Sequence, residues 1–111
     1  MRAADSSNNP YLGAALVLAA GLEGVRDKID PGAPHTDNMY LKSPAELAAL
    51  NVSYLPRTLE ESISAFEEDP LTKQVFGELM AKTYVDFKRN EWESYMNHVS
   101  DWERAQYLKF Y

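Results

Sequence analysis

The sequence predicts a mainly α-helical chain. Four segments begin with residues that commonly cap helices, at Asn9, Ser43, Thr58 and Ser100. Between residues 78 and 98, apolar side chains recur at spacings near three and four, which is the period of an α-helix. No segment shows the apolar–polar alternation that is typical of a half-buried strand. The 111 residues have room for one domain.

The first expected helix runs from Pro10 to about Lys28. Asn9 can cap its free amides, and proline at the first helical position loses no hydrogen bond. Apolar residues occupy its whole circumference: Leu12, Ala14, Ala15, Leu16, Val17, Leu18, Ala19, Ala20 and Leu22. A helix that is apolar on every side must be covered on every side. We therefore expect this helix to lie inside a larger body than one short acidic chain provides.

Residues 30–40 are expected to form a long loop, because two prolines and a glycine interrupt regular structure there. Ser43 followed by proline should begin a short helix that ends near Leu50. Residues 51–57 are expected to be irregular.

Thr58 and Glu61 fit a capping box, which should open a helix to about Glu68. A further short helix is expected from Asp69 to Phe76, where a glycine ends it. The long helix over 78–98 carries a stripe of apolar side chains: Met80, Tyr84, Val85, Trp92, Tyr95, Met96 and Val99. A second capping box, Ser100 with Glu103, predicts a final short helix.

Composition excludes several classes of function. The net charge of −6 and a pI near 4.8 argue against nucleic acid or an anionic membrane as the main partner. The absence of cysteine excludes disulfides and thiol nucleophiles and mildly favours a cytoplasmic location. We see no secretory signal, and the apolar run over residues 11–22 is too short to span a bilayer.

No catalytic or metal-ligating set emerges from the residue pattern. His35 and His98 are far apart in sequence and belong to no metal-binding motif. The acidic runs at 60–61 and 67–69 are interpreted as caps and solvated faces. We therefore assign no catalytic residue and no metal ligand within this chain.

Three motifs near the start carry a family resemblance. The first motif is Arg2-x-x-Asp5 followed by Asn9-Pro10-Tyr11. The second is Ala-Ala-Gly-Leu-x-Gly at residues 19–24, and the third is Lys-Ile-Asp-Pro-Gly at residues 28–32. Together they resemble the C-terminal part of the catalytic domain of the glutamine synthetase family. The ending, from Val99 to Leu108, looks more like the branch of γ-glutamylmethylamide synthetases. The resemblance implies that residues 1–111 are the helical C-terminal portion of an α+β catalytic domain, with most of the sheet outside this chain.

The resemblance implies that Arg2 binds the carboxylate of the substrate glutamate. A guanidinium presents a planar fork of donors that matches a carboxylate with two parallel hydrogen bonds. Two departures from the family pattern are visible. The metal-binding glutamate that lies two positions before this arginine has no counterpart, and the usual proline before Asp5 is Ala4.

Tyr40 lies in the expected loop, where some bacterial glutamine synthetases carry a nucleotidylated tyrosine. The aspartate that follows the tyrosine in that motif is Leu41 here, and Lys42 is nearby. Tyr40 is therefore a possible modification site, and a plain surface tyrosine is the favoured interpretation.

By resemblance, the complete enzyme is an ATP-dependent ligase that joins ammonia or a small amine to the γ-carboxylate of glutamate. ATP and Mg²⁺ or Mn²⁺ would bind residues outside this chain, which alone should be inactive and bind neither. Its expected partners are the rest of the catalytic domain or homologous subunits of a ring-shaped oligomer. The alternative is a non-catalytic helical interaction protein derived from the same family. Which amine is used cannot be read from these residues.

Overall fold

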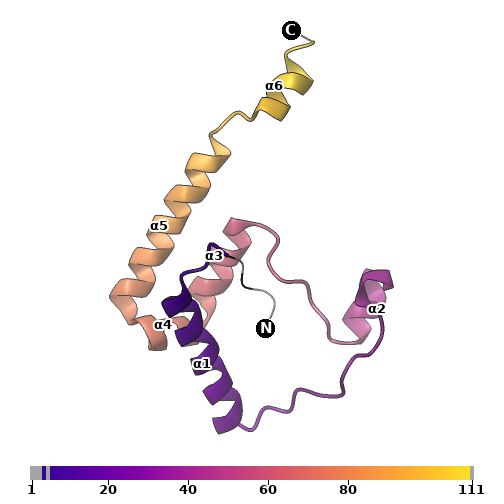
Figure 1. Cartoon of the computed structure of the whole chain (residues 1–111), viewed down its shortest axis with the longest axis vertical. Coiled ribbons are helices and arrows are strands. Elements are labelled where there is room, and N and C mark those ends of the chain that lie inside the picture. Colours follow the sequence, from indigo (N-terminus) through magenta and orange to yellow (C-terminus); the bar gives the residue numbers. More distant parts are fainter. Residues whose placement is uncertain (1–3, 5, 111) are drawn as a thin grey trace. The chain divides into compact units, whose positions relative to one another are not determined.

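The computed structural model describes residue 4 and residues 6–110, and in that part of the chain every regular element is a helix. The chain divides into two compact units, Met1–Arg57 and Thr58–Tyr111, which are described separately. The helices of the first unit are α1 (Pro10–Arg26), the 3₁₀-helix η1 (Met39–Leu41) and α2 (Pro44–Ala49). Those of the second are α3 (Leu59–Glu68), α4 (Pro70–Phe76), α5 (Glu78–Met96) and α6 (Asp101–Tyr107) (Figure 1). The predicted mainly α fold is confirmed.

Helix α1 begins as predicted and ends two residues early. The Asn9 carboxamide oxygen accepts hydrogen bonds from the amides of Tyr11, at 3.0 Å, and Leu12, at 3.3 Å. At the other end Lys28 adopts a left-handed conformation, with φ of 53°. The amide of Lys28 then bonds the carbonyl of Val25, and that of Ile29 bonds the carbonyl of Gly24. This pair of bonds is a Schellman motif, which terminates the helix before Lys28.

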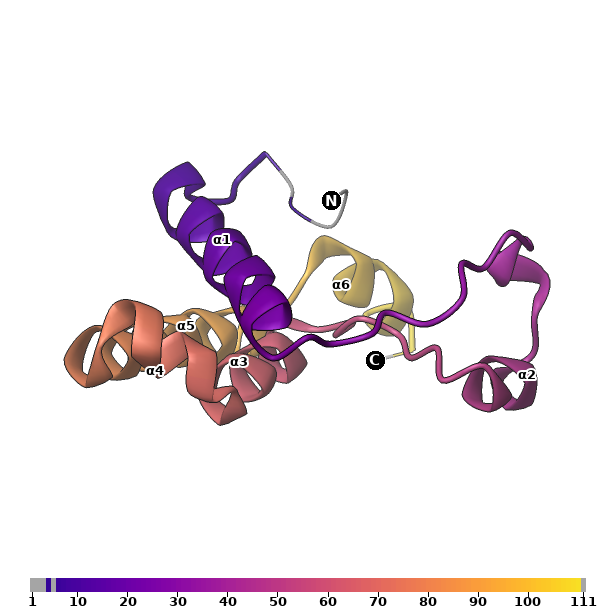
Figure 2. The ribbon, with the colours of Figure 1, turned by 90° about the horizontal axis from the view of Figure 1, so that it is seen from below.

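Helix α2 is held at both ends by local bonds. At its start, the Ser43 amide and hydroxyl donate to the Glu46 carboxylate at 2.7 and 2.6 Å, which completes a capping box. At its end Asn51 has a φ of 55°, and Val52 bonds back to the carbonyl of Leu47. Asparagine tolerates the left-handed region better than most residues. Figures 1 and 2 both show α2 separated from α1 by the long loop that the sequence predicted.

The first unit does not itself cover α1. No residue of the helix is buried, and the side chains of Leu18 and Leu22 are 65% and 60% exposed. The one buried hydrophobic residue that the structure describes in this unit is Leu47, on α2. The helix that is apolar on every side thus lacks, within its own unit, the cover that its sequence requires.

The second unit has a small core between α3, α4 and α5. Ile63 of α3 packs with the buried Ala81 and Val85 of α5 in the region where these helices contact each other. Thr72 of α4 is also buried. Its hydroxyl lies 2.8 Å from the carbonyl oxygen of Phe66 and 2.7 Å from that of Asp69, so it ties the end of α3 to the start of α4.

Three aromatic rings extend this core, one from each helix. Phe66 of α3 lies 5.5 Å from Phe76 of α4 and 5.3 Å from Tyr84 of α5, measured between ring centroids. Phe76 and Tyr84 meet edge to face at 6.1 Å. Tilted and edge-to-face pairs at these separations are favourable arrangements for aromatic rings.

The apolar stripe predicted along the long helix packs only over its first half. Val85 is buried and Tyr84 is half-buried, whereas Tyr95, Met96 and Val99 are each more than 60% exposed. The reason is the length of the packing helices: α3 and α4 lie beside the first half of α5 and leave its second half uncovered (Figure 1). Helix α5 ends at Met96, two residues before the predicted end.

The chain exposes more surface than its mass predicts. Its accessible surface is 9742 Å² for 12.6 kDa. Even two separately folded bodies of half that mass would together expose only about 7,500 Å². Many apolar side chains of the described residues are exposed, Leu18, Leu22 and Met96 among them.

The last helix depends on its cap, because none of its described residues is buried. The Glu103 carboxylate accepts bonds from the amide of Ser100, at 2.7 Å, and from its hydroxyl, at 2.8 Å. These bonds, that of the amide first, hold the pKa of Glu103 below its usual value. A lowered carboxyl pKa contributes stability above the unfolded-state pKa and loses it as the pH falls through the folded-state value.

We therefore expect α6 to lose helical structure on acidification below about pH 4, because an unperturbed glutamate is half-protonated near that pH and the pKa of Glu103 in the folded helix is lower still. Backbone chemical shifts of residues 101–107 would measure the loss. Glu103→Gln is the matched control, since a neutral amide still accepts the bonds of the cap but does not titrate in this range. Equal loss of helix in both proteins would show that the carboxylate is not responsible.

Candidate functional site

The segment that leads into α1 is the candidate site singled out by the sequence. Arg2, the expected substrate-binding residue, lies outside the described residues, as does Asp5. The chain turns at residues 6–8 and enters α1 through the Asn9 cap. The side chain of Asn8 lies against Gly13, so closely that a Cβ built on the glycine would be 2.3 Å from Asn8 Nδ2.

The sequence-based interpretation missed this contact. No motif in the sequence pairs Asn8 with Gly13. The available signal was a glycine in the first turn of a helix, where alanine would be more favourable. That signal does not name the neighbouring side chain, which only the structure reveals.

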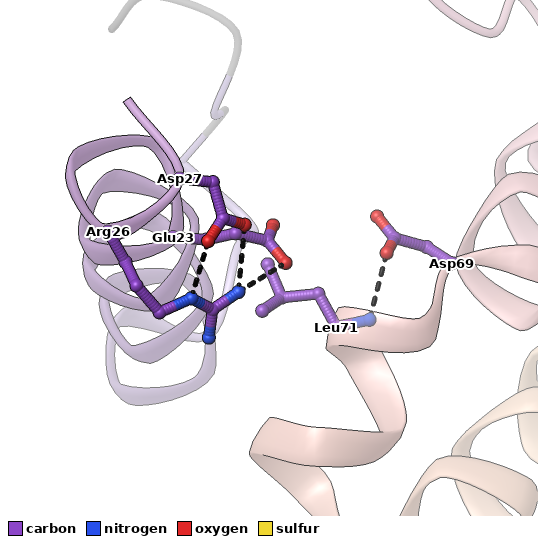
Figure 3. Close-up of polar contacts among 5 residues, drawn as sticks. All are labelled: Glu23, Arg26, Asp27, Asp69 and Leu71. Carbon is purple, nitrogen blue, oxygen red and sulfur yellow. Dashed lines mark hydrogen bonds and ion pairs between the residues drawn. The ribbon is translucent and has the colours of Figure 1, made fainter. Parts of the chain in front are cut away.

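The C-terminal end of α1 carries a charged cluster (Figure 3). The Arg26 guanidinium donates from Nε and Nη2 to the two carboxylate oxygens of Asp27, at 2.7 and 2.9 Å, and Glu23 lies at 3.6 Å. The two hydrogen bonds raise the pKa of Arg26 and lower that of Asp27. All three side chains are solvent-accessible, so such pairs contribute little to stability. Because Nε and Nη2 of Arg26 already donate to Asp27, this pair of donors is not available to a ligand.

Tyr40 lies on η1 with its side chain 98% exposed. Asn38 caps this short helix by accepting a bond from the Tyr40 amide at 3.0 Å. Lys42 Nζ donates to Asp37 at 2.9 Å, and this bond lowers the pKa of Asp37. The turn is therefore locally ordered and presents the phenol to solvent. Its modification stays a prediction.

Two cavities are lined by described residues of the second unit. One, of about 180 Å³, is lined mainly by apolar and aromatic side chains of α3 and α5, with Lys88 at 2.6 Å from Glu91. The other, of about 240 Å³, borders α3, α4 and α5 and includes Glu67, which also pairs with Arg89. The second cavity includes a hydroxyl, carboxylates and lysines, but the Thr72 hydroxyl bonds backbone carbonyls and Glu67 pairs with Arg89. In neither cavity do the described residues show a hydrogen bond from a nucleophile to a base, which is the arrangement expected of a catalytic centre.

Residue 4 and residues 6–110, which the structure describes, contain no cluster of metal ligands. No three His, Asp or Glu side chains in that part approach one another as metal ligands would. In the same residues, no helix has the length and apolar character needed to cross a lipid bilayer.

At the start of α4, the Asp69 carboxylate caps the helix through the Leu71 amide at 2.9 Å (Figure 3), which confirms its interpretation as a cap.

Comparison with known proteins gives a consistent result. Residues 1–107 match the family model of the glutamine synthetase catalytic domain. The chain is 42% identical over all 111 residues to the glutamate–methylamine ligase of Methyloversatilis universalis. It is 38% identical over 107 residues, or 96% of its length, to the glutamine synthetase of Archaeoglobus fulgidus. It spans 25% and 22% of the lengths of these two relatives.

A solved structure shares the fold. The structure described as apo GmaS without ligand matches 97% of this chain with a TM-score of 0.80 and 34% sequence identity, and the match covers 24% of that protein. The helical elements described above therefore occur in a much longer protein of the same kind. The chain belongs to the glutamine synthetase family and corresponds to a helical C-terminal part of its catalytic domain.

Proposed function

We propose that this chain works as part of an ATP-dependent ligase that joins ammonia or a small amine to the γ-carboxylate of glutamate. The observation that carries the proposal is the match of residues 1–107 to the catalytic domain of glutamine synthetase, with 42% identity to a glutamate–methylamine ligase. The exposed apolar helix α1 supports it, since such a helix needs cover from additional protein.

Within that enzyme, Arg2 would hold a carboxylate of glutamate through its guanidinium fork. The γ-carboxylate oxygen would take the γ-phosphoryl group of ATP, which leaves ADP. The amine nitrogen would then attack the carbon of the γ-carboxyl group, the bond from that carbon to the phosphate oxygen would break, and the nitrogen would lose a proton. The residues of this chain take no direct part in either transfer.

Mg²⁺ or Mn²⁺ would neutralise phosphate charge in these transfers. The part of the chain that the structure describes does not gather a set of metal ligands, so it does not fit such an ion by itself. The partners proposed for this chain are accordingly the rest of the catalytic domain and homologous subunits, which together would supply the sites for metal and ATP.

The test compares the isolated chain with a chimera. In the chimera, these 111 residues replace the matching 25% of the Methyloversatilis universalis ligase. We expect the isolated chain to release no phosphate from ATP with glutamate and methylamine, and the chimera to do so. The parent ligase is the positive control, and the ligase without the segment is the negative control. A folded, correctly assembled but inactive chimera would contradict the proposal.

The alternative is a non-catalytic interaction protein derived from the family. The observation that favours this alternative is the exposure of Leu18 and Leu22 on α1, because exposed apolar side chains can bind another protein. The isolated chain distinguishes the two. An aggregating chain that binds a hydrophobic dye, and is rescued by the preceding part of the ligase, supports the ligase proposal. A well-folded, monomeric chain that does not complement the ligase supports the alternative.

A further inference from the structure

We propose that α4 is a hinged strap over the core of the second unit, and that the Thr72 hydroxyl is the latch that holds this strap closed. The strap is the segment Pro70–Phe76, which lies between non-helical residues at both ends. When it opens, α3 and α5 stay packed against each other, and the aromatic rings that α4 contacts become accessible. Opening of α4 does not require the ligase activity proposed above.

Both ends of α4 are backbone hinges. Asp69 joins α3 to α4 in an extended conformation, with φ of −77° and ψ of 117°. At the other end Gly77 has φ of 74° and ψ of 156°, a region that glycine adopts readily and other residues rarely adopt. The amide of Gly77 still bonds the carbonyl of Lys73, and the amide of Ala81 bonds the carbonyl of Gly77. The interruption between α4 and α5 therefore depends on the dihedral angles of one residue.

Helix α4 has a small buried surface. Among its seven residues, all of which the structure describes, only Thr72 is buried. The Thr72 hydroxyl lies 2.8 Å from the carbonyl oxygen of Phe66 and 2.7 Å from that of Asp69, so it fastens α4 to the backbone at the corner with α3. Toward α5, the ring of Phe76 meets that of Tyr84 edge to face at 6.1 Å. A helix of about two turns has little stability of its own, so α4 depends on these attachments.

The contact between α3 and α5 is the firmer one. Ile63, Ala81 and Val85 are buried where these two helices meet. An ion pair between Glu67 of α3 and Arg89 of α5 joins the same helices. By contrast, the cavity of about 240 Å³ borders α4, so the packing beside that helix is incomplete. Because an empty space gives few contacts that opening would break, the free energy of local opening should be lower for α4 than for α3.

The experiment measures amide hydrogen exchange by mass spectrometry in the full chain of 111 residues. In the parent chain, the amides of residues 73–77 should exchange faster than those of residues 63–68. Thr72→Val keeps the shape of the side chain but removes the hydroxyl, so it should accelerate exchange of residues 73–77 by about five- to tenfold. Thr72→Ser keeps the hydroxyl and is the matched control, with a smaller expected effect.

Gly77→Ala tests the hinge between α4 and α5. A Cβ on Gly77 would have no atom within 4 Å, so the new methyl group meets no obstacle and acts only through the backbone. Because alanine disfavours a φ of 74°, exchange of residues 73–77 should rise by about tenfold, while that of residues 63–68 changes little. Gly24→Ala, at an equally open position of α1, is the control and should leave both segments unchanged.

Three results would contradict the strap. Equal exchange rates for residues 63–68 and 73–77 in the parent chain would mean that α4 does not open separately from α3. Equal acceleration of both segments by Thr72→Val would show a general loss of stability rather than release of a latch. Parent-like exchange in Gly77→Ala would show that this residue is not the hinge.

Discussion

Replacing Arg2 with alanine in the chimeric ligase is expected to raise the KM for glutamate by more than about 100-fold. Hydrogen bonds to charged groups are worth about 1.5–3 kcal/mol each, and the guanidinium would make two of them to one carboxylate. The KM for ATP should stay unchanged, since no part of the nucleotide is assigned to this residue. Initial rates at varied glutamate and varied ATP would measure both constants.

Arg2→Lys is the matched control for that experiment. Lysine keeps the positive charge but loses the planar fork, so it should recover only part of the glutamate affinity. Equal increases in the KM for glutamate and for ATP, in both variants, would indicate a structural defect in the segment and would remove the carboxylate role from Arg2.

Phe66→Ala should be the most destabilising of the single substitutions considered in the second unit. Its ring contacts those of Phe76 and Tyr84, and its carbonyl accepts the bond of the buried Thr72 hydroxyl. Removing a buried phenylalanine side chain costs about 3–5 kcal/mol, and for the half-buried Phe66 we expect about 3 kcal/mol, which is still comparable to the whole stability of a small core. We expect the residues from Thr58 onward to lose their cooperative unfolding transition, measured by urea titration with far-ultraviolet circular dichroism.

Phe87→Ala on α5 provides the comparison. It removes the same side chain from a residue that is 63% exposed, so the free energy of unfolding should change little. Similar losses in the two variants would mean that the three-ring cluster does not hold α3, α4 and α5 together.

Helix positions were largely predictable because the signals that start helices are local. Asn9, Ser43, Thr58 and Ser100 each cap a helix through bonds to amides two or three residues away. Such bonds require no knowledge of the rest of the fold. Helix ends were less predictable. Helix α1 ends before Lys28 because that lysine adopts a left-handed conformation, and a lysine in the sequence does not predict this conformation.

For the candidate site, the sequence predicted only what the resemblance to family motifs implies. The motif that begins at Arg2 indicates a role in binding glutamate, but the residue lies outside the described part of the chain and its role remains a proposal. The contact between Asn8 and Gly13 could not be predicted, because many side chains can use the space beside a glycine. The locally ordered turn around Tyr40 became visible only in the structure.

The sequence by itself determined the helical class, the starts of the helices and the membership of the family. These depend on short-range hydrogen bonds, on the period of apolar residues and on motifs that can be read along the chain. Only the tertiary structure decided which apolar residues are buried. Val85 is enclosed while Met96, on the same predicted stripe, is exposed, because α3 and α4 pack beside only the first half of α5. Burial depends on the length and placement of neighbouring elements, which no local pattern specifies.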